Sequence, residues 1–139
     1  MTGIAILAVA VVAALVFGFY RKRADGRFRP QVMREEWAAI SAALPDAELG
    51  ERATFVQFSS AFCAPCRTTR ALLADIAERE DGVAHLEIDA EKHLDLVRAL
   101  DVRRTPTTLV LDADGLELTR AAGAPRRDQV LSVLPEVAR

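Results

Sequence analysis

The 139-residue chain has few cysteines and histidines, the residues on which disulfide scaffolds and zinc-binding proteins depend. It has two cysteines, and its two histidines are His85 and His93. Two cysteines are too few for a secreted scaffold that is held together by several disulfides. A structural zinc site needs four ligands, usually with a second Cys or His pair at matched spacing, and the two histidines do not form such a pair. The sequence therefore predicts neither a disulfide scaffold nor a metal site.

Net positive charge is concentrated in one short segment. Residues 1–31 carry five basic residues against one acidic residue, whereas the whole chain has a formal net charge of −2. The rest of the chain is therefore acidic overall. A protein that binds nucleic acid usually carries a basic patch on a folded face. We therefore expect no nucleic-acid partner.

The longest apolar run, Ile4–Tyr20, contains no charged residue. Ten of its residues are Ile, Leu, Val or Phe, and their summed membrane-insertion free energy is roughly −3 to −6 kcal/mol. Its length is at the short end for a membrane-spanning helix. The alternatives are a cleaved signal peptide and a buried helix. Residues 1–3 have no basic side chain, which a signal peptide normally carries there, so the run favours a transmembrane anchor that contacts the lipid bilayer through residues 4–20.

Basic residues directly follow this run, at positions 21–23. Because positive residues near a membrane span stay in the cytoplasm, we expect a single-pass protein of the cell membrane with its N-terminus outside and its catalytic domain cytoplasmic. The same residues also suit anionic lipid headgroups. The expected organisation is a transmembrane anchor over 1–20, a basic linker over 21–31 and a folded domain over 32–139.

Beyond residue 53, apolar strands alternate with amphipathic helices. The expected strands cover 54–59, 83–89, 107–111 and 116–122, and the expected helices cover 68–79, 91–100 and 125–137. A shorter helix is expected over 35–44 and an edge strand over 27–32. Residues 112–115 contain an Asp-Gly pair between apolar runs, which predicts a hairpin turn. This order predicts an α/β fold with a mixed sheet flanked by helices on both faces, preceded by one N-terminal transmembrane helix.

The two cysteines lie two residues apart in Phe62–Arg67, between a predicted strand and a predicted helix. A C-x-x-C motif at such a junction indicates a dithiol redox site. A cysteine at a helix N-terminus faces unpaired N–H groups and the positive end of the helix dipole, which stabilise its thiolate. The thiolate is the species that attacks disulfides. Pro65 is tolerated in the first helical turn because its missing N–H has no partner there.

Residues 54–139 resemble the thioredoxin family. The resemblance is carried by four features in the family's order: the motif Phe62–Cys66, the strand 83–89 that ends in aspartate, the segment Arg104–Thr107, which is similar to the family's cis-proline loop, and the Asp-Gly hairpin with Gly123 beyond it. Thioredoxin itself typically has tryptophan at the position of Phe62 and glycine at that of Ala64. The resemblance implies a thioredoxin-like fold and a thiol-disulfide oxidoreductase that uses no metal or organic cofactor.

The same resemblance implies roles for individual residues. Cys63 would be the exposed nucleophile and Cys66 the resolving cysteine, and the two would form a redox-active disulfide. Pro106 would follow a cis peptide bond, and Thr105 would offer its backbone to a substrate chain. The implied partners are protein disulfide substrates and an electron donor that the sequence does not identify. In a reducing cytoplasm the reaction would run toward reduction.

Two positions depart from the family pattern. Thioredoxins bury an aspartate beneath the cysteines, facing a lysine, and the matching positions here are Gln57 and His85. Gln57 cannot accept a proton, whereas His85 can, because its ordinary pKa is about 6.5. Two interpretations remain open: His85 is the base that helps to deprotonate Cys66, or Gln57 and His85 are a buried hydrogen-bonded pair with a packing role.

Four arginines near the motif have two interpretations. They either lower the pKa of the Cys63 thiol and attract acidic partners, or are ordinary solvated charges; they are Arg67, Arg70, Arg103 and Arg104. Two alternative functions also remain open. One is an extracytoplasmic thiol-disulfide oxidoreductase, which requires the opposite membrane topology. The other is a non-catalytic thioredoxin-fold module that binds a partner at the membrane.

Overall fold

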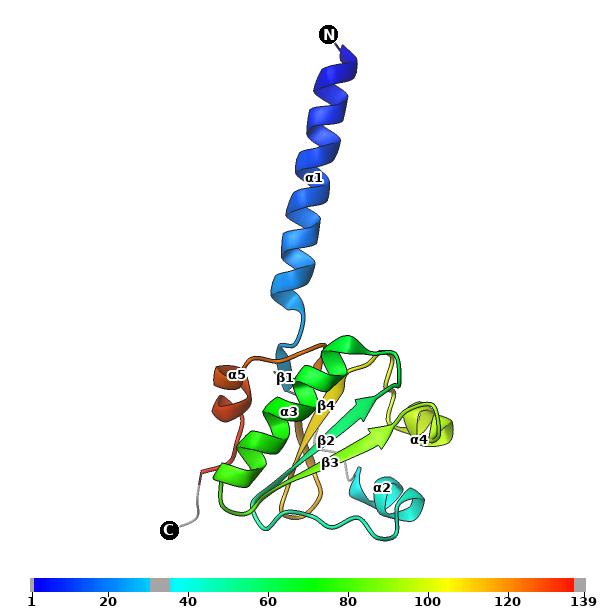
Figure 1. Ribbon diagram of the computed structural model, residues 1–139, viewed down its shortest axis with the longest axis vertical. Coiled ribbons are helices and arrows are strands. Elements are labelled where there is room, and N and C mark those ends of the chain that lie inside the picture. The colour runs from blue at the N-terminus through cyan, green and yellow to red at the C-terminus, as the bar shows by residue number, and fades with distance from the viewer. Residues whose placement is uncertain (1, 31–35, 137–139) are drawn as a thin grey trace.

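The structure is a computed structural model, and it describes residues 2–30 and 36–136 (Figure 1). Its helices are α1 (Thr2–Ala24), α2 (Trp37–Ala43), α3 (Ala64–Arg79), α4 (Leu94–Ala99) and α5 (Arg127–Ser132). Its strands are β1 (Phe28–Pro30), β2 (Ala53–Ser59), β3 (Val83–Asp89), β4 (Thr107–Asp112) and β5 (Glu117–Ala122). Figure 1 shows α1 projecting from a domain that the other elements form.

The strands form one mixed sheet in the order β1-β5-β4-β2-β3. β2 pairs with β3 in parallel and with β4 antiparallel, and β5 pairs antiparallel with β4 and β1. Every residue of β2 is buried, as expected for a strand that is covered on both faces. The predicted α/β fold with a mixed sheet flanked by helices is confirmed.

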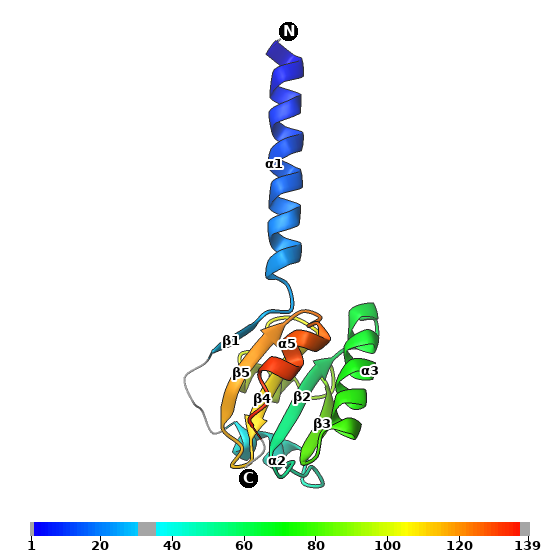
Figure 2. The same cartoon turned by 90° about the vertical axis from the view of Figure 1, so that its left-hand side faces the viewer.

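Figure 2 shows helices on both sides of the sheet. Two hydrophobic clusters lie between the sheet and these helices. The first cluster lies under α2 and α4 and includes Ile40, Phe58 and Leu96. The second lies under α3 and α5 and includes Phe55 and Leu73. β2 contributes to both clusters because successive side chains of a strand point to opposite faces of the sheet.

The helices of the domain differ in length from those predicted. α2 covers Trp37–Ala43, within the predicted 35–44, of which residue 35 lies outside the described residues. α3 begins at Ala64 rather than at residue 68, because Cys63 caps it and Pro65 fits its first turn. α4 begins at Leu94 rather than at residue 91 and ends at Ala99, before Asp101 adopts a left-handed conformation with φ of 51°. α5 ends at Ser132 because Pro135 has no N–H and restricts the residue before it.

The residues predicted to form a basic linker, 21–31, are divided between two elements. Residues 21–24 continue α1, and residues 28–30 form β1, so the described connection between helix and sheet consists of residues 25–27. The ends of the predicted edge strand and of the last predicted helix, residues 31, 32 and 137, lie outside the described residues.

α1 packs against no other element along its apolar length. Its span Gly3–Ala24 is long and apolar enough to cross a membrane, and none of it is buried. An N-terminal signal sequence has the same two properties. The position of this helix outside the hydrophobic core means that the domain does not need it for packing.

Candidate active site

The two cysteines lie at the start of α3 and form a disulfide, with their Cα atoms 5.2 Å apart. Cys63 is the N-cap residue of α3, and its Sγ accepts a hydrogen bond from the Cys66 N–H at 3.2 Å. The Cys63 sulfur therefore lies where the unpaired N–H groups and the helix dipole stabilise a negative charge. Cys63 is half-buried, whereas the Cys66 residue is 1% exposed. An incoming disulfide can therefore reach Cys63 but not Cys66.

The cis-proline loop lies beside the dithiol. The peptide bond between Thr105 and Pro106 is cis, and the Thr105 Oγ1 lies 3.3 Å from the Ser60 Oγ, three residues before Cys63. The Pro106 carbonyl accepts the Gly123 N–H at 2.7 Å, which ties the loop to the end of β5. Thr105 and Pro106 are thus brought together with the cysteines from two separate segments of the chain.

Gln57 lies fully buried beneath α3 and joins Cys66 to His85. Its Nε2 donates to the Cys66 backbone carbonyl at 2.9 Å, and its Oε1 lies 3.1 Å from the His85 Nε2. Because a backbone carbonyl can only accept, the Gln57 amide has one allowed orientation. Its Oε1 must then accept a hydrogen bond from the His85 Nε2–H, so neutral His85 carries its hydrogen on Nε2 and its lone pair on Nδ1.

Burial lowers the pKa of His85 below its ordinary value, and the nearby Arg70 acts in the same direction while Glu87 opposes it. The histidine is therefore neutral near pH 7. The side chain that contacts the Cys66 peptide group is Gln57, and His85 lies behind it. In this geometry His85 contacts Gln57 through Nε2, and Nδ1 is the nitrogen that carries the lone pair.

Most of the arginines near the motif pair with carboxylates. Arg70 contacts Glu87 at 2.7 Å, Arg103 contacts Asp101 at 3.0 Å, and Arg104 pairs with Asp25. Arg67 is exposed on α3. Since a paired cation contributes less to the surrounding field, these residues attract acidic partners less than four free arginines would.

Glu87 is a site residue that the sequence patterns did not indicate, although it alternates with His85 on β3 and therefore faces the same side of the sheet. Its carboxylate accepts the Ser59 hydroxyl at 2.7 Å and the Arg70 guanidinium. Partial burial opposes its charge, but these two donors outweigh burial and lower its pKa. A pocket of about 250 Å³ lies beside the motif and is lined by Ser60, Arg70 and Glu87, among others.

Among residues 2–30 and 36–136, no group of three or more His, Cys, Asp or Glu side chains is placed to hold a metal ion. His93 precedes α4, and its side chain does not cap that helix.

Comparison with known proteins gives the same picture as the geometry. A family model described as a thioredoxin-like domain matches residues 40–138. The chain is 24% identical over 98 residues to a thioredoxin H-type of Oryza sativa subsp. indica, which covers 70% of this chain and 80% of the rice protein. It is 37% identical over 60 residues to human thioredoxin domain-containing protein 2, covering 43% of this chain but 11% of the human protein. The structure of reduced Schistosoma mansoni thioredoxin pre-protein superposes with a TM-score of 0.55 at 20% identity, covering 68% of this chain and 85% of the other.

Proposed function

Because this chain belongs to the thioredoxin family and is a thiol-disulfide oxidoreductase, we propose that it is anchored in the cell membrane and reduces protein disulfides on the cytoplasmic side. One observation carries the proposal: the half-buried, accessible member of the Cys63–Cys66 pair caps α3 next to the cis-proline loop. The sulfur that a substrate can reach is therefore the one whose thiolate the helix stabilises.

The reaction proceeds in two exchanges. The Cys63 thiolate attacks one sulfur of the substrate disulfide, which breaks that bond, forms a mixed disulfide and releases one substrate thiolate. The Cys66 thiolate then attacks the Cys63 Sγ and releases the second substrate thiolate. Both released sulfurs take protons from solvent. Two electrons pass to the substrate, and the enzyme is left with the Cys63–Cys66 disulfide, which a dithiol donor must reduce again.

Supporting roles are proposed for the residues around the dithiol. Thr105 and Pro106 bind the extended substrate chain beside Cys63. Because Pro106 has no N–H, it cannot donate an additional backbone hydrogen bond to that chain. Pro65 stiffens the turn between the sulfurs. Gln57, oriented by His85, holds the Cys66 carbonyl and so fixes the first turn of α3.

The membrane assignment is supported by the helix and by the basic residues at its end. α1 is apolar and exposed, and its last turn carries Arg21, Lys22 and Arg23. Since basic residues next to a span stay in the cytoplasm, the domain is assigned to that side. β1 begins at Phe28 and is part of the sheet, so the chain leaves little room between the helix and the fold for removal of a signal peptide.

The activity is tested with the full-length protein in detergent, by reduction of insulin disulfides. The wild-type chain is expected to accelerate reduction, Cys63→Ser to show background rates, and Cys66→Ser to accumulate a mixed disulfide with the substrate. Thr68→Ser, a variant on the exposed side of α3, is the matched control. Background rates for the wild-type chain would instead favour the non-catalytic binding module.

Membrane side and direction are tested separately. A reporter fused after Arg139 should be active in the cytoplasm, and activity outside would favour the extracytoplasmic alternative. A reduction potential of the dithiol near about −270 mV supports a reductant, whereas a value near about −120 mV indicates a disulfide donor. The second value would contradict the cytoplasmic placement.

A further inference from the structure

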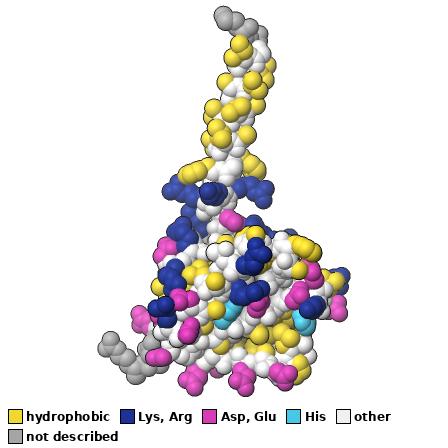
Figure 3. Space-filling model, in the orientation of Figure 1, with side chains coloured by type: hydrophobic (Ala, Val, Ile, Leu, Met, Phe, Trp, Pro, Cys, Tyr) yellow, Lys and Arg dark blue, Asp and Glu magenta, His cyan; other side chains and the backbone are white. Residues whose placement is uncertain are grey.

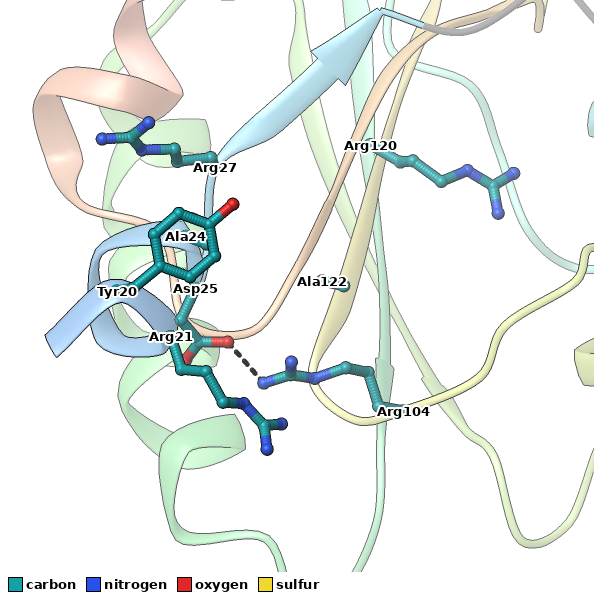
Figure 4. Close-up of a pocket in the computed structure, with 8 residues that line it drawn as sticks. All are labelled: Tyr20, Arg21, Ala24, Asp25, Arg27, Arg104, Arg120 and Ala122. Carbon is teal, nitrogen blue, oxygen red and sulfur yellow. Dashed lines mark hydrogen bonds and ion pairs between the residues drawn. The ribbon is translucent and has the colours of Figure 1, made fainter. Parts of the chain in front are cut away.

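The residue directly after α1 contacts the cis-proline loop. Asp25 accepts a hydrogen bond from the guanidinium of Arg104, two residues before Pro106 (Figure 4). The same carboxylate lies against Gly123, where a Cβ atom would be 2.1 Å from the Asp25 Oδ1. Gly123 in turn donates its N–H to the Pro106 carbonyl. The base of α1 and one wall of the dithiol site are therefore in direct contact.

The connection between helix and sheet is short and held in place. The Gly26 N–H donates to the Ala122 carbonyl at 2.9 Å. Gly26 has a φ of 71°, and a Cβ atom there would be 2.1 Å from the Ala124 carbonyl oxygen, so this close approach requires glycine. Phe28 already pairs with Ala121 in the sheet. The domain therefore has a fixed orientation relative to α1 and does not hang from a flexible linker.

This orientation places the dithiol close to the membrane. Asp25 lies five residues beyond Tyr20, the last residue of the apolar run, which corresponds to about 8 Å along a helix. Figures 1 and 2 show α3 starting at the end of the domain nearest to α1 and running away from it. Cys63 and the cis-proline loop thus lie at the edge of the domain that faces the bilayer.

The side chains at this edge suit a membrane surface. Phe62, next to the nucleophilic cysteine, is 97% exposed, and an exposed apolar ring of this kind can insert into the membrane interface. The exposed basic residues at the base of α1 are Arg21, Lys22, Arg23 and Arg27. The opposite end of the domain carries exposed acidic residues, namely Glu51, Asp81, Asp114 and Glu136. Figure 3 shows this separation, with Lys and Arg gathered below the apolar helix and acidic side chains at the far end.

We infer that the substrate of this dithiol is a disulfide in the membrane-adjacent segment of another membrane protein. The inference rests on the proposed function and adds a substrate class to it. Because Cys63 is held at a fixed height and faces the bilayer, a disulfide that emerges a few residues from a membrane span reaches it by lateral diffusion. A disulfide on a soluble domain would have to enter the narrow space between the domain and the lipid. Each turnover transfers two electrons to that disulfide and leaves two thiols on the partner.

The test uses the full-length protein, pre-reduced, in vesicles of phosphatidylcholine and phosphatidylglycerol, under single-turnover conditions. Two single-span peptides serve as probes. In the near probe, an intramolecular disulfide begins three residues from the span. In the far probe, a helical spacer of about 20 residues holds the same disulfide about 30 Å further out. We expect the near probe to be reduced at least about tenfold faster, because the effective concentration of its disulfide at Cys63 is higher.

The matched variant carries ten Gly and Ser residues inserted between Ala24 and Asp25. This insertion keeps the Asp25–Arg104 contact and β1, but it lets the domain move over about 17 Å. The ratio of near to far rates should fall to about three or less. A small aromatic disulfide in solution should be reduced at the same rate by both proteins, since the insertion leaves the site intact.

The two proposals fail in different ways. Equal rates for the near and far probes in the wild-type chain overturn the inference while leaving the reductase activity in place, and this comparison does not depend on the insertion variant. Failure to reduce any of the three disulfides contradicts the proposed function itself. A near-to-far ratio that stays high in the insertion variant also overturns the inference, because the preference would then come from the sequence of the probe.

Discussion

The two faces of the sheet are built differently. The face under α2 and α4 has an apolar centre, to which the strands contribute Val56, Phe58, Ile88, Leu109 and Leu111. At β5 the same face carries a buried ion pair of Glu117 and Arg120. The face under α3 is apolar at one end, around Phe55 and Val110, and polar at the other. The strand residues of this polar half are Gln57, Ser59, His85, Glu87 and Thr108.

This difference shows where polar groups are tolerated in the core of a small domain. In the polar half, Gln57 bonds to Cys66 and His85, and Ser59 bonds to Glu87. Each bond satisfies a group that would otherwise cost free energy on burial. Both halves lie under α3. The polar half lies under the N-terminal end of this helix, where the two cysteines are. The dithiol is thus supported by the polar half of the face under α3, whereas the buried pair of Glu117 and Arg120 lies on the opposite face of the sheet.

The largest predicted effect tests whether the apolar parts of the two faces are equivalent. Phe55→Ala and Phe58→Ala each remove a fully buried ring, one from each face. Each should reduce the free energy of unfolding by about 3–5 kcal/mol. Guanidinium unfolding of the oxidised protein, followed by the fluorescence of Trp37, measures both. If one variant lost less than about 1 kcal/mol, the two clusters would not be equivalent parts of the core.

The next effect distinguishes the polar half from the apolar one. Gln57→Leu keeps a side chain of similar size but leaves the Cys66 carbonyl and the His85 N–H without their hydrogen-bond partner. It should cost about 1–3 kcal/mol. Its control is Thr108→Val on the paired position of β4. The Thr108 hydroxyl is buried and has no hydrogen-bond partner among the described residues, so its removal should be neutral or stabilising by about 1 kcal/mol.

A result in which both variants lose equal stability would mean that Thr108 has a polar partner in solution and that the polar half extends to β4. The reduction potential of the dithiol gives a second way to distinguish the two variants. Because Gln57 holds the Cys66 carbonyl, Gln57→Leu should also change the reduction potential of the dithiol, whereas Thr108→Val should not. Thiol-disulfide equilibrium with glutathione measures both variants.

The third prediction concerns pH. Burial lowers the pKa of His85 in the folded protein, so between pH 7 and pH 5 the unfolded chain, with an ordinary histidine pKa of about 6.5, binds more protons than the folded one. The contribution of the buried, neutral His85 to stability is complete above a pH of about 6.5. It is lost as the pH falls through the lower pKa that His85 has in the folded protein. Oxidised wild-type protein should therefore lose stability across this range. His85→Gln should lose less, and parallel curves for the two proteins would contradict the assigned burial of the neutral form.

Much of this architecture can be predicted from local sequence patterns, as particular elements show. β3 has the predicted bounds, Val83–Asp89, because alternation within a strand is a local property. The Asp-Gly hairpin forms as expected, with Gly115 at a φ of 83°. The predicted start of α3 is too late because its first turn is defined by a cap and by Pro65, not by an apolar period. Helix ends depend on such individual contacts and are poorly marked by periodicity.

The contacts that could not be predicted join segments far apart in the chain. Asp25 and Arg104 are separated by 79 positions, and no local pattern relates them. Glu87 could have been found, since it shares a face with His85, but its partners Ser59 and Arg70 depend on the register of β2 and on the crossing of α3. The C-x-x-C motif is visible in the sequence because its chemistry requires neighbouring residues.

The smallest predicted effect tests whether the polar half depends on its surface charge. Arg70 contacts Glu87 at 2.7 Å, but its side chain is 53% exposed. Pairs of this kind contribute about 0–1 kcal/mol because water and salt screen them. Arg70→Ala should therefore lower the free energy of unfolding by no more than Arg98→Ala, which removes an exposed pair with Asp95 on α4. A loss above about 2 kcal/mol, reproduced at high salt, would mean that the arginine belongs to the buried network, and the polar half would then extend to the protein surface.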